Sequence, residues 1–180
     1  MKDTMFLLLA MFASISVVAQ ENFTLTNEST LSVDGTSTLH DWTVTANTYQ
    51  GSLILDDHVF TTISFEVDVA SIVSTRGATM DKKTHNALKK DEHPKIIFIA
   101  KDVAFSEGDN QSIQGKLTIA GVGKDVVIDA TIKIFEGKIQ IAGDHKITLQ
   151  DYNMEPPTAM FGSIVVGDDV VVNFDLIFTK

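Results

Sequence analysis

The sequence predicts an all-β protein: a single antiparallel up-and-down β-barrel of about eight strands with one short helix. Apolar and polar residues alternate over several segments, as in half-buried strands of an antiparallel sheet. Short polar or glycine-bearing turns separate the segments, so strands adjacent in sequence are expected to be neighbours in the sheet. Several segments reach ten residues, and long strands in a meander favour a closed, lipocalin-like barrel over a sandwich.

The expected strands follow one another along almost the whole chain, and the first two can form one continuous strand. They lie near 29–34, 36–47, 49–55, 60–72, 95–104, 111–121, 124–136, 138–151 and 168–179. One segment near residues 79–90 is expected to be helical, with Thr79 or Asp81 as its cap. Pro94 ends whatever precedes it, and residues 154–158 form an extended loop that is unsuited to a sheet interior.

The first 19 residues are predicted to be a signal peptide. Lys2 supplies a positive charge, residues 6–18 form a largely apolar run, and Ala19 is a small residue that suits cleavage. The run is too short for a stable membrane anchor. We therefore expect one mature domain at residues 20–180 in the periplasm or outside the cell; the alternative is a buried N-terminal helix.

Composition excludes several classes of function. The chain has no cysteine, which argues against disulfides, thiol catalysis, sulfur-based zinc sites and a lipid anchor on cysteine. Its formal net charge is −10, and an acidic surface repels nucleic acids and disfavours electrostatic docking on anionic lipids. Five lysines nevertheless cluster near Arg76, either as a solvated helix face or as a positive rim for an anionic headgroup: Lys82, Lys83, Lys89, Lys90 and Lys95.

The alternation assigns one face of each strand to the barrel interior. The large side chains expected there are Trp42, Phe65, Val67, Phe98, Leu117, Ile128 and Phe174. Small residues share that face, namely Ala46, Ala100, Ala130 and Gly143. A barrel of this size can be filled by its side chains or can hold one small ligand, and the pattern alone leaves both outcomes open. A one-residue slip would invert the set on any strand.

No motif indicates catalysis. Ser37, His40 and Asp41 lie close in sequence, but on a strand His40 and Asp41 point to opposite faces and cannot pair as a triad requires. Asp81 and His85 are four residues apart on the expected helix, which is more typical of a surface ion pair than of a metal site. We therefore expect no catalytic residue, no metal and no cofactor.

Four segments resemble the YceI-like family, whose members are lipocalin-like lipid-binding barrels. They are residues 65–72, the group Arg76, Met80, Asp81 and His85, residues 93–98, and residues 115–124 with the pattern G-x-L-T-I-x-G-V-x-K. The chain departs from the family at residues 35–42 and lacks an aromatic-acidic F-F-D element near the helix, which leaves room for a different headgroup. The resemblance implies a periplasmic or secreted protein, often dimeric, that holds a lipid tail along the barrel axis.

The expected function is non-enzymatic binding and carriage or storage of an isoprenoid-type lipid, such as a polyisoprenoid or an isoprenoid quinone. Its tail would contact the interior residues, and its headgroup would lie near Arg76, His85 and the expected helix. His40, on the same face as Trp42, is a further expected ligand-binding residue. Expected partners are this lipid, membranes in transient contact, and a second copy of the chain, but not nucleic acid. The alternatives are a filled β-module without ligand and an enzyme that uses His40 or His85 as a general base on an apolar substrate.

Overall fold

The computed structural model describes residues 20–180 apart from residue 109, and the predicted signal peptide lies outside the described part of the chain. The strands are β1 Glu21–Leu25, β2 Thr30–Ser37, β3 Trp42–Ala46, β4 Tyr49–Asp56, β5 Val59–Asp68, β6 Ile72–Ser74, β7 Lys95–Ala104, β8 Asn110–Ile119, β9 Val122–Phe135, β10 Lys138–Thr148, β11 Thr158–Ala159 and β12 Ile164–Thr179. The helices are α1 Ala78–Ala87 and three short 3-10 turns, Val69–Ser71, Leu149–Tyr152 and Met160–Gly162.

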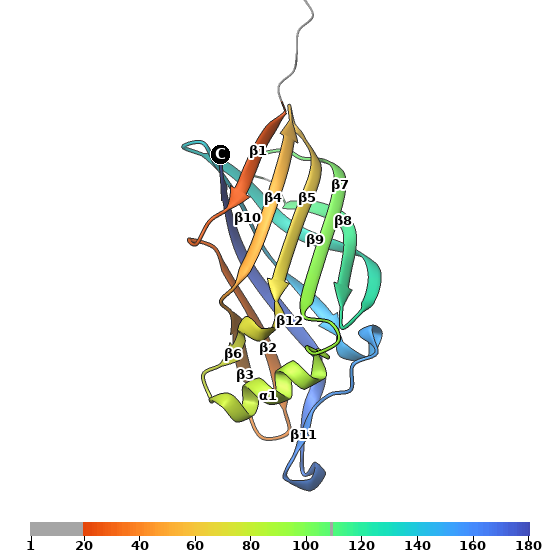
Figure 1. The fold of residues 1–180 in the computed structure, drawn as a ribbon. Coiled ribbons are helices and arrows are strands. Elements are labelled where there is room, and N and C mark those ends of the chain that lie inside the picture. Colours follow the sequence, from red (N-terminus) through yellow and green to blue (C-terminus); the bar gives the residue numbers. More distant parts are fainter. Residues whose placement is uncertain (1–19, 109) are drawn as a thin grey trace, which may run out of the picture.

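The sheet closes on itself, which confirms the predicted antiparallel up-and-down barrel. Hydrogen-bonded neighbours follow the order β1-β4-β5-β7-β8-β9-β10-β12, and β12 pairs back to β1 through Thr24–Thr179 and Leu25–Phe178. Figure 1 shows the ring with α1 across its lower end. We call this lower end, which also carries β11, the open end, and we call the opposite end, where β1 begins, the closed end.

Two strands of the ring are interrupted at the same level. In the first, β1 and β2 are consecutive segments separated between Leu25 and Thr30. In the second, β3 and β4 are consecutive segments separated between Ala46 and Tyr49. Ser29 bridges the first interruption, because its hydroxyl accepts from the Ile177 amide at 2.9 Å. Below this level β2, β3 and β6 continue the wall of the barrel toward the open end.

The strand predicted at residues 36–47 is wrong, because the chain turns between β2 and β3. The Ser37 hydroxyl accepts from the amides of Leu39 and His40 and donates to the His40 carbonyl at 2.7 Å. Serine side chains that bind nearby backbone groups in this way favour turns over strands. His40 and Asp41 therefore lie in a turn, and the first strand, β1, was not among the expected strands.

Helix α1 is confirmed, but it is shorter than predicted and is not capped by Thr79 or Asp81. Gly77, with φ +86°, stands at the N-cap, and the Asp81 carboxylate instead accepts from the Ser74 amide at 2.6 Å. The helix ends in a Schellman motif, in which Lys89 has φ +53° and the Lys90 amide donates to the His85 carbonyl at 2.9 Å. No helix among the described residues is long and apolar enough to span a bilayer.

Side chains fill the closed end of the barrel. The largest fully buried ones, Phe60, Phe178, Leu53, Ile132 and Ile139, belong to strands that meet there. Phe60 also stacks on Phe105, with ring centroids 4.3 Å apart. This end is a packed core, whereas the open end is hollow.

Candidate functional site

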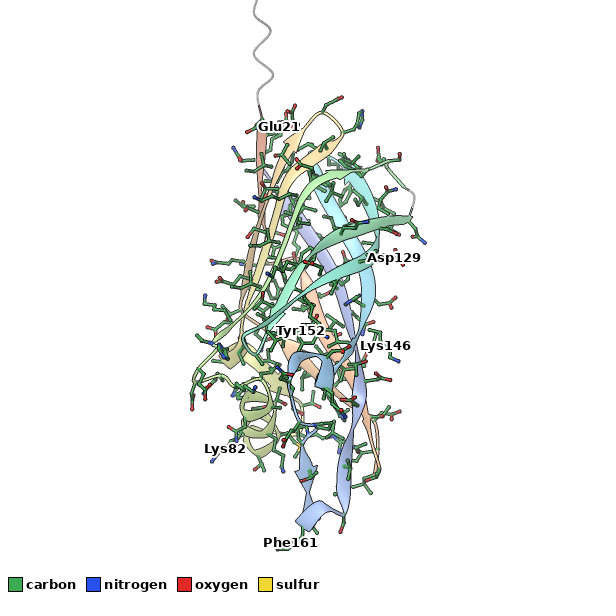
Figure 2. The ribbon with its side chains drawn as sticks, turned by 90° about the vertical axis from the view of Figure 1, so that its right-hand side faces the viewer. Glu21, Lys82, Asp129, Lys146, Tyr152 and Phe161 are labelled. Carbon is green, nitrogen blue, oxygen red and sulfur yellow. The ribbon has the colours of Figure 1, made fainter. Side chains whose placement is uncertain are left out.

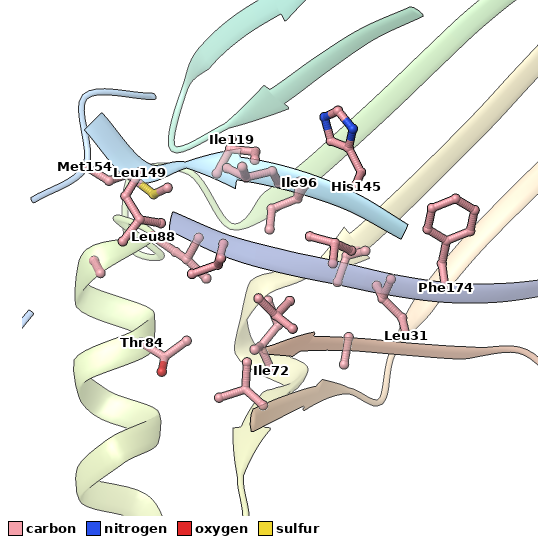
Figure 3. Close-up of a pocket in the computed structure, with 18 of the residues that line it drawn as sticks. Leu31, Ile72, Thr84, Leu88, Ile96, Ile119, His145, Leu149, Met154 and Phe174 are labelled. Carbon is pink, nitrogen blue, oxygen red and sulfur yellow. The ribbon is translucent and has the colours of Figure 1, made fainter. Parts of the chain in front are cut away.

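A cavity of about 530 Å³ occupies the open end of the barrel. Its size falls within the roughly 300–1,000 Å³ that is typical of single-ligand sites. It lies between β2, β3, β5, β7 to β10 and β12, with α1 along one side (Figure 3). Its lining runs from buried Phe178 to exposed His40, Arg76 and Thr158, so the cavity opens to solvent at the end of the barrel that carries α1 and β11.

The walls are apolar because strand alternation turns one face of each strand inward. On β12 every second residue from Val170 lines the cavity: Val170, Val172, Phe174, Leu176 and Phe178. Two glycines let aromatic rings lie flat against the wall. A Cβ on Gly35 would come within 2.1 Å of the Trp42 ring, and a Cβ on Gly115 within 2.5 Å of the Phe98 ring.

The structure brings most of the predicted site residues together. The seven predicted interior residues all line this cavity: Trp42, Phe65, Val67, Phe98, Leu117, Ile128 and Phe174. His40 and Arg76 line its mouth. His85 does not line the cavity, because its Nε2 donates to the Ile72 carbonyl at 2.8 Å and ties α1 to β6. Binding of a lipid by these residues stays a prediction.

Polar groups gather at the mouth. Arg76 Nη1 lies 2.6 Å from His40 Nε2, so this nitrogen accepts, and Nδ1 carries the proton toward the Asp41 carbonyl at 3.2 Å. On the other side Lys83 donates to the Thr158 carbonyl at 2.6 Å and ties α1 to β11. The mouth thus presents two cations beside an apolar interior.

His145 is a cavity residue that was not among the predicted site residues. Its half-buried imidazole lines the wall on β10, and it lies near Phe174 on the side away from α1 (Figure 3). Burial lowers the pKa of His145, and the carboxylates of Asp129 and Asp144 partly oppose that shift. No described residue forms a hydrogen bond with the ring. A polar residue on an otherwise apolar face was the sequence signal for it.

The helix was expected near the headgroup, but its cavity-lining residues and the hairpin that follows residue 154 were not predicted. Met80, Thr84 and Ala87 of α1 and Leu88 at its C-cap line the cavity and follow helical spacing on one face. The predicted loop at residues 154–158 leads into β11, where Thr158 pairs with Val165 of β12. Within residues 20–108 and 110–180 there is no group of three acidic or histidine side chains that could hold a metal ion.

The family model of the YceI-like domain matches residues 23–178 of this chain. The chain belongs to the YceI-like family. No curated protein matches this YceI-like protein. Among solved structures it is similar to Burkholderia cenocepacia BcnA, with 19% identity, a TM-score of 0.71 and coverage of 83% of this chain and 96% of that one.

Two other structures share the fold of this YceI-like protein. A polyisoprenoid binding domain from Saccharophagus degradans is 12% identical, with a TM-score of 0.71 and coverage of 90% of this chain and 99% of that one. The Campylobacter jejuni YCEI protein is 24% identical, with a TM-score of 0.63 and coverage of 76% and 84%. Identities this low establish the common fold alone.

Proposed function

We propose that this YceI-like protein binds one isoprenoid-type lipid in its cavity and carries or stores it, chemically unchanged, in the cell envelope. The observation that carries the proposal is the unfilled space of about 530 Å³ behind apolar walls. Each methylene group of a lipid buried there gains about 0.8 kcal/mol over its exposure to water. A filled β-module without ligand does not account for this space.

The tail extends from the mouth toward Phe178, along the seven interior residues named above, and the headgroup stays at the mouth. There Arg76 and Lys83 offer cationic donors, which suit an oxygen-bearing headgroup such as a phosphate, carbonyl or hydroxyl. His40 orients Arg76 through their hydrogen bond. His85 is outside this arrangement, and we assign it no contact with the lipid.

The cargo class rests on the family and on one relative. The Saccharophagus degradans domain with this fold is described as polyisoprenoid binding. A polyisoprenoid, an isoprenoid quinone or a similar lipid is therefore the cargo that we propose. The predicted signal peptide supports a periplasmic or secreted location, and a homodimer stays a prediction.

The geometry around His40 favours binding over catalysis. Ser37 Oγ donates to the His40 backbone carbonyl rather than to the imidazole. The imidazole Nδ1 faces the Asp41 carbonyl rather than its carboxylate. A nucleophile, base and orienting acid in series are therefore not assembled at this place, and we propose no catalytic role for the three residues.

Native purification followed by solvent extraction and mass spectrometry tests the proposal. We expect one lipid per protein, with mass spacing of isoprene units. An extract without lipid, unchanged after incubation of the protein with envelope lipids, would refute carriage.

Replacing Phe65 by aspartate tests where the lipid lies. A carboxylate in the apolar wall must be neutralised or left without solvation, so we expect lipid affinity to fall by about a hundredfold or more. Lys138→Ala, at the closed end where Lys138 pairs with Glu28 at 2.8 Å, should bind as the parent does. Equal binding by the two variants would place the lipid elsewhere. Circular dichroism of both variants checks that they fold.

A further inference from the structure

Large apolar side chains project into solvent at the open end. Phe161 is fully exposed and Met160 is 69% exposed, at the end of the hairpin formed by β11 and β12. Figure 2 shows Phe161 at the extreme of the molecule, opposite Glu21. Leu39, in the β2–β3 turn, and Val165, in β12, are exposed as well. We call Leu39, Met160, Phe161 and Val165 the apolar tip.

Hydrogen bonds hold the two parts of the apolar tip together. The Thr38 amide donates to the Val165 carbonyl at 3.0 Å, and the Val165 amide donates to the Thr38 hydroxyl at 3.2 Å. The Thr38 hydroxyl also lies 3.4 Å from the Ser163 carbonyl. Leu39, next to Thr38 in the chain, is thereby fixed beside the hairpin that carries Met160 and Phe161.

The backbone of the apolar tip adopts an unfavourable conformation. Met160 and Phe161 have φ of +50° and +55°, in the left-handed region that suits glycine or asparagine. No packing compensates for it, since both side chains face solvent. Strained backbone of this kind tends to be found at functional sites. Exposed apolar patches mark contacts with proteins or membranes.

The apolar tip is continuous with the mouth of the cavity. Pro157, Thr158, Ile164 and Val166 of the same hairpin line the cavity, whereas Met160, Phe161 and Val165 face outward. One hairpin therefore forms a wall of the cavity and the outermost surface of the open end (Figure 1). Whatever the apolar tip contacts is brought directly to the mouth.

We propose that the apolar tip inserts into the surface of a lipid bilayer and seats the cavity mouth on the membrane. A lipid could then move between bilayer and cavity without crossing water. The charges beside the apolar tip are of both signs, with Arg76 and Lys83 at the mouth and Asp41 and Glu155 in the adjoining loops. Burial of apolar surface rather than charge should therefore drive insertion, and added salt should change it little. This inference goes beyond lipid carriage and does not depend on it.

Flotation with phosphatidylcholine vesicles tests the insertion. The double variant Met160→Asn, Phe161→Asn removes both side chains, and asparagine tolerates their left-handed backbone, so the fold should be kept. We expect the parent to float. The affinity of the double variant for the vesicles should be lower than that of the parent by a factor of about ten or more. Phe135→Asn is the matched control, because Phe135 is 41% exposed in the β9–β10 hairpin at the closed end. It should float like the parent.

Two outcomes overturn the proposal: the parent fails to float, or the double variant floats as well as the parent. If, in the second case, the parent is a dimer that the double variant dissociates, the occupant of the apolar tip is a second copy of the chain. Uptake of lipid from vesicles should be slower in the double variant, whereas binding of lipid supplied in detergent micelles should be unchanged. A parent that floats but never retains lipid would refute carriage and leave insertion standing.

Discussion

The closed and open ends of this barrel follow the same alternation, yet one is packed and the other, where β2, β3 and β6 replace β1 and β4 in the wall, is hollow. At the closed end Phe60, Phe105 and Phe178 fill the interior. At the open end aromatic residues alternate with smaller ones that face inward, among them Val44, Ala46 and Val172. Space for a ligand therefore remains where the wall passes to β2, β3 and β6 and where residues as small as Ala46 face inward.

Helix α1 extends the contrast, because it covers the open end without filling it. None of its residues is buried, although one face of the helix lines the cavity. The His85 bond to Ile72 and the Lys83 bond to Thr158 hold it across the end of the barrel. A lid held by a few polar bonds leaves the interior accessible in a way that a packed aromatic layer does not.

Truncating one phenylalanine at each end should give the largest difference between the two ends, measured as the loss in free energy of unfolding. Phe60→Ala empties a fully packed position, so we expect the free energy of unfolding to fall by about 3–5 kcal/mol. Phe65→Ala should cost about 2 kcal/mol or less, because the ring already borders empty space. Urea denaturation of lipid-free protein measures both. Equal losses would mean that the open end is as tightly packed as the closed end.

Filling the cavity with a larger side chain should make the open end resemble the packed closed end and should weaken lipid binding. Ala46→Phe places a ring in the cavity, and we expect lipid affinity to fall by about tenfold while the free energy of unfolding changes by no more than about 1 kcal/mol. Thr45→Phe is the matched control, since Thr45 is the exposed neighbour on β3 and adds the same ring outside. Titration of each variant with a prenol measures its lipid affinity and distinguishes Ala46→Phe from Thr45→Phe. Loss of affinity in the control would point to a defect in folding instead.

The smallest expected effect concerns His145, a half-buried histidine in the wall of the cavity at the open end. Burial lowers its pKa below the usual 6.5, so the unfolded chain takes up a proton before the folded protein does. The free energy of unfolding should therefore decrease as the pH falls from about 6.5, over the interval between the two pKa values. His145→Gln should reduce this slope. Identical slopes for parent and His145→Gln would show that the imidazole is solvated like a free one.

Alternation was sufficient to predict most strands of the ring, because period-two patterns depend only on local burial, but it missed β1. It could not predict the turn between β2 and β3 or the interruption between β1 and β2, which depend on individual side-chain bonds such as those of Ser37 and Ser29. These are turn signals that resemble ordinary strand residues in sequence. The end of α1 was misplaced for a similar reason, since a Schellman motif built on Lys89 lacks the usual glycine.

The interior residues of the candidate site were predictable from alternation, whereas its rim was predicted only in part, through His40 and Arg76. His85 follows the spacing of a helix face, but only the three-dimensional position of β6 shows that it bonds to Ile72. The contribution of the β11–β12 hairpin depends on a contact with the β2–β3 turn across more than a hundred residues, as the bond between Thr38 and Val165 shows. Such long-range contacts leave no local pattern.

The pairing of β12 with β1 and β2 makes the last strand the one that completes the ring. Contacts across this seam join residues 139 to 155 positions apart, as in Asn173 with Asp34 and Thr24 with Thr179. Such distant contacts slow folding, because a long loop must close before they form. Until β12 arrives, the sheet has two free edges that can pair with other chains. The chain is therefore most prone to aggregation just before its C-terminal strand docks, and a chaperone that shields those edges would act at that moment.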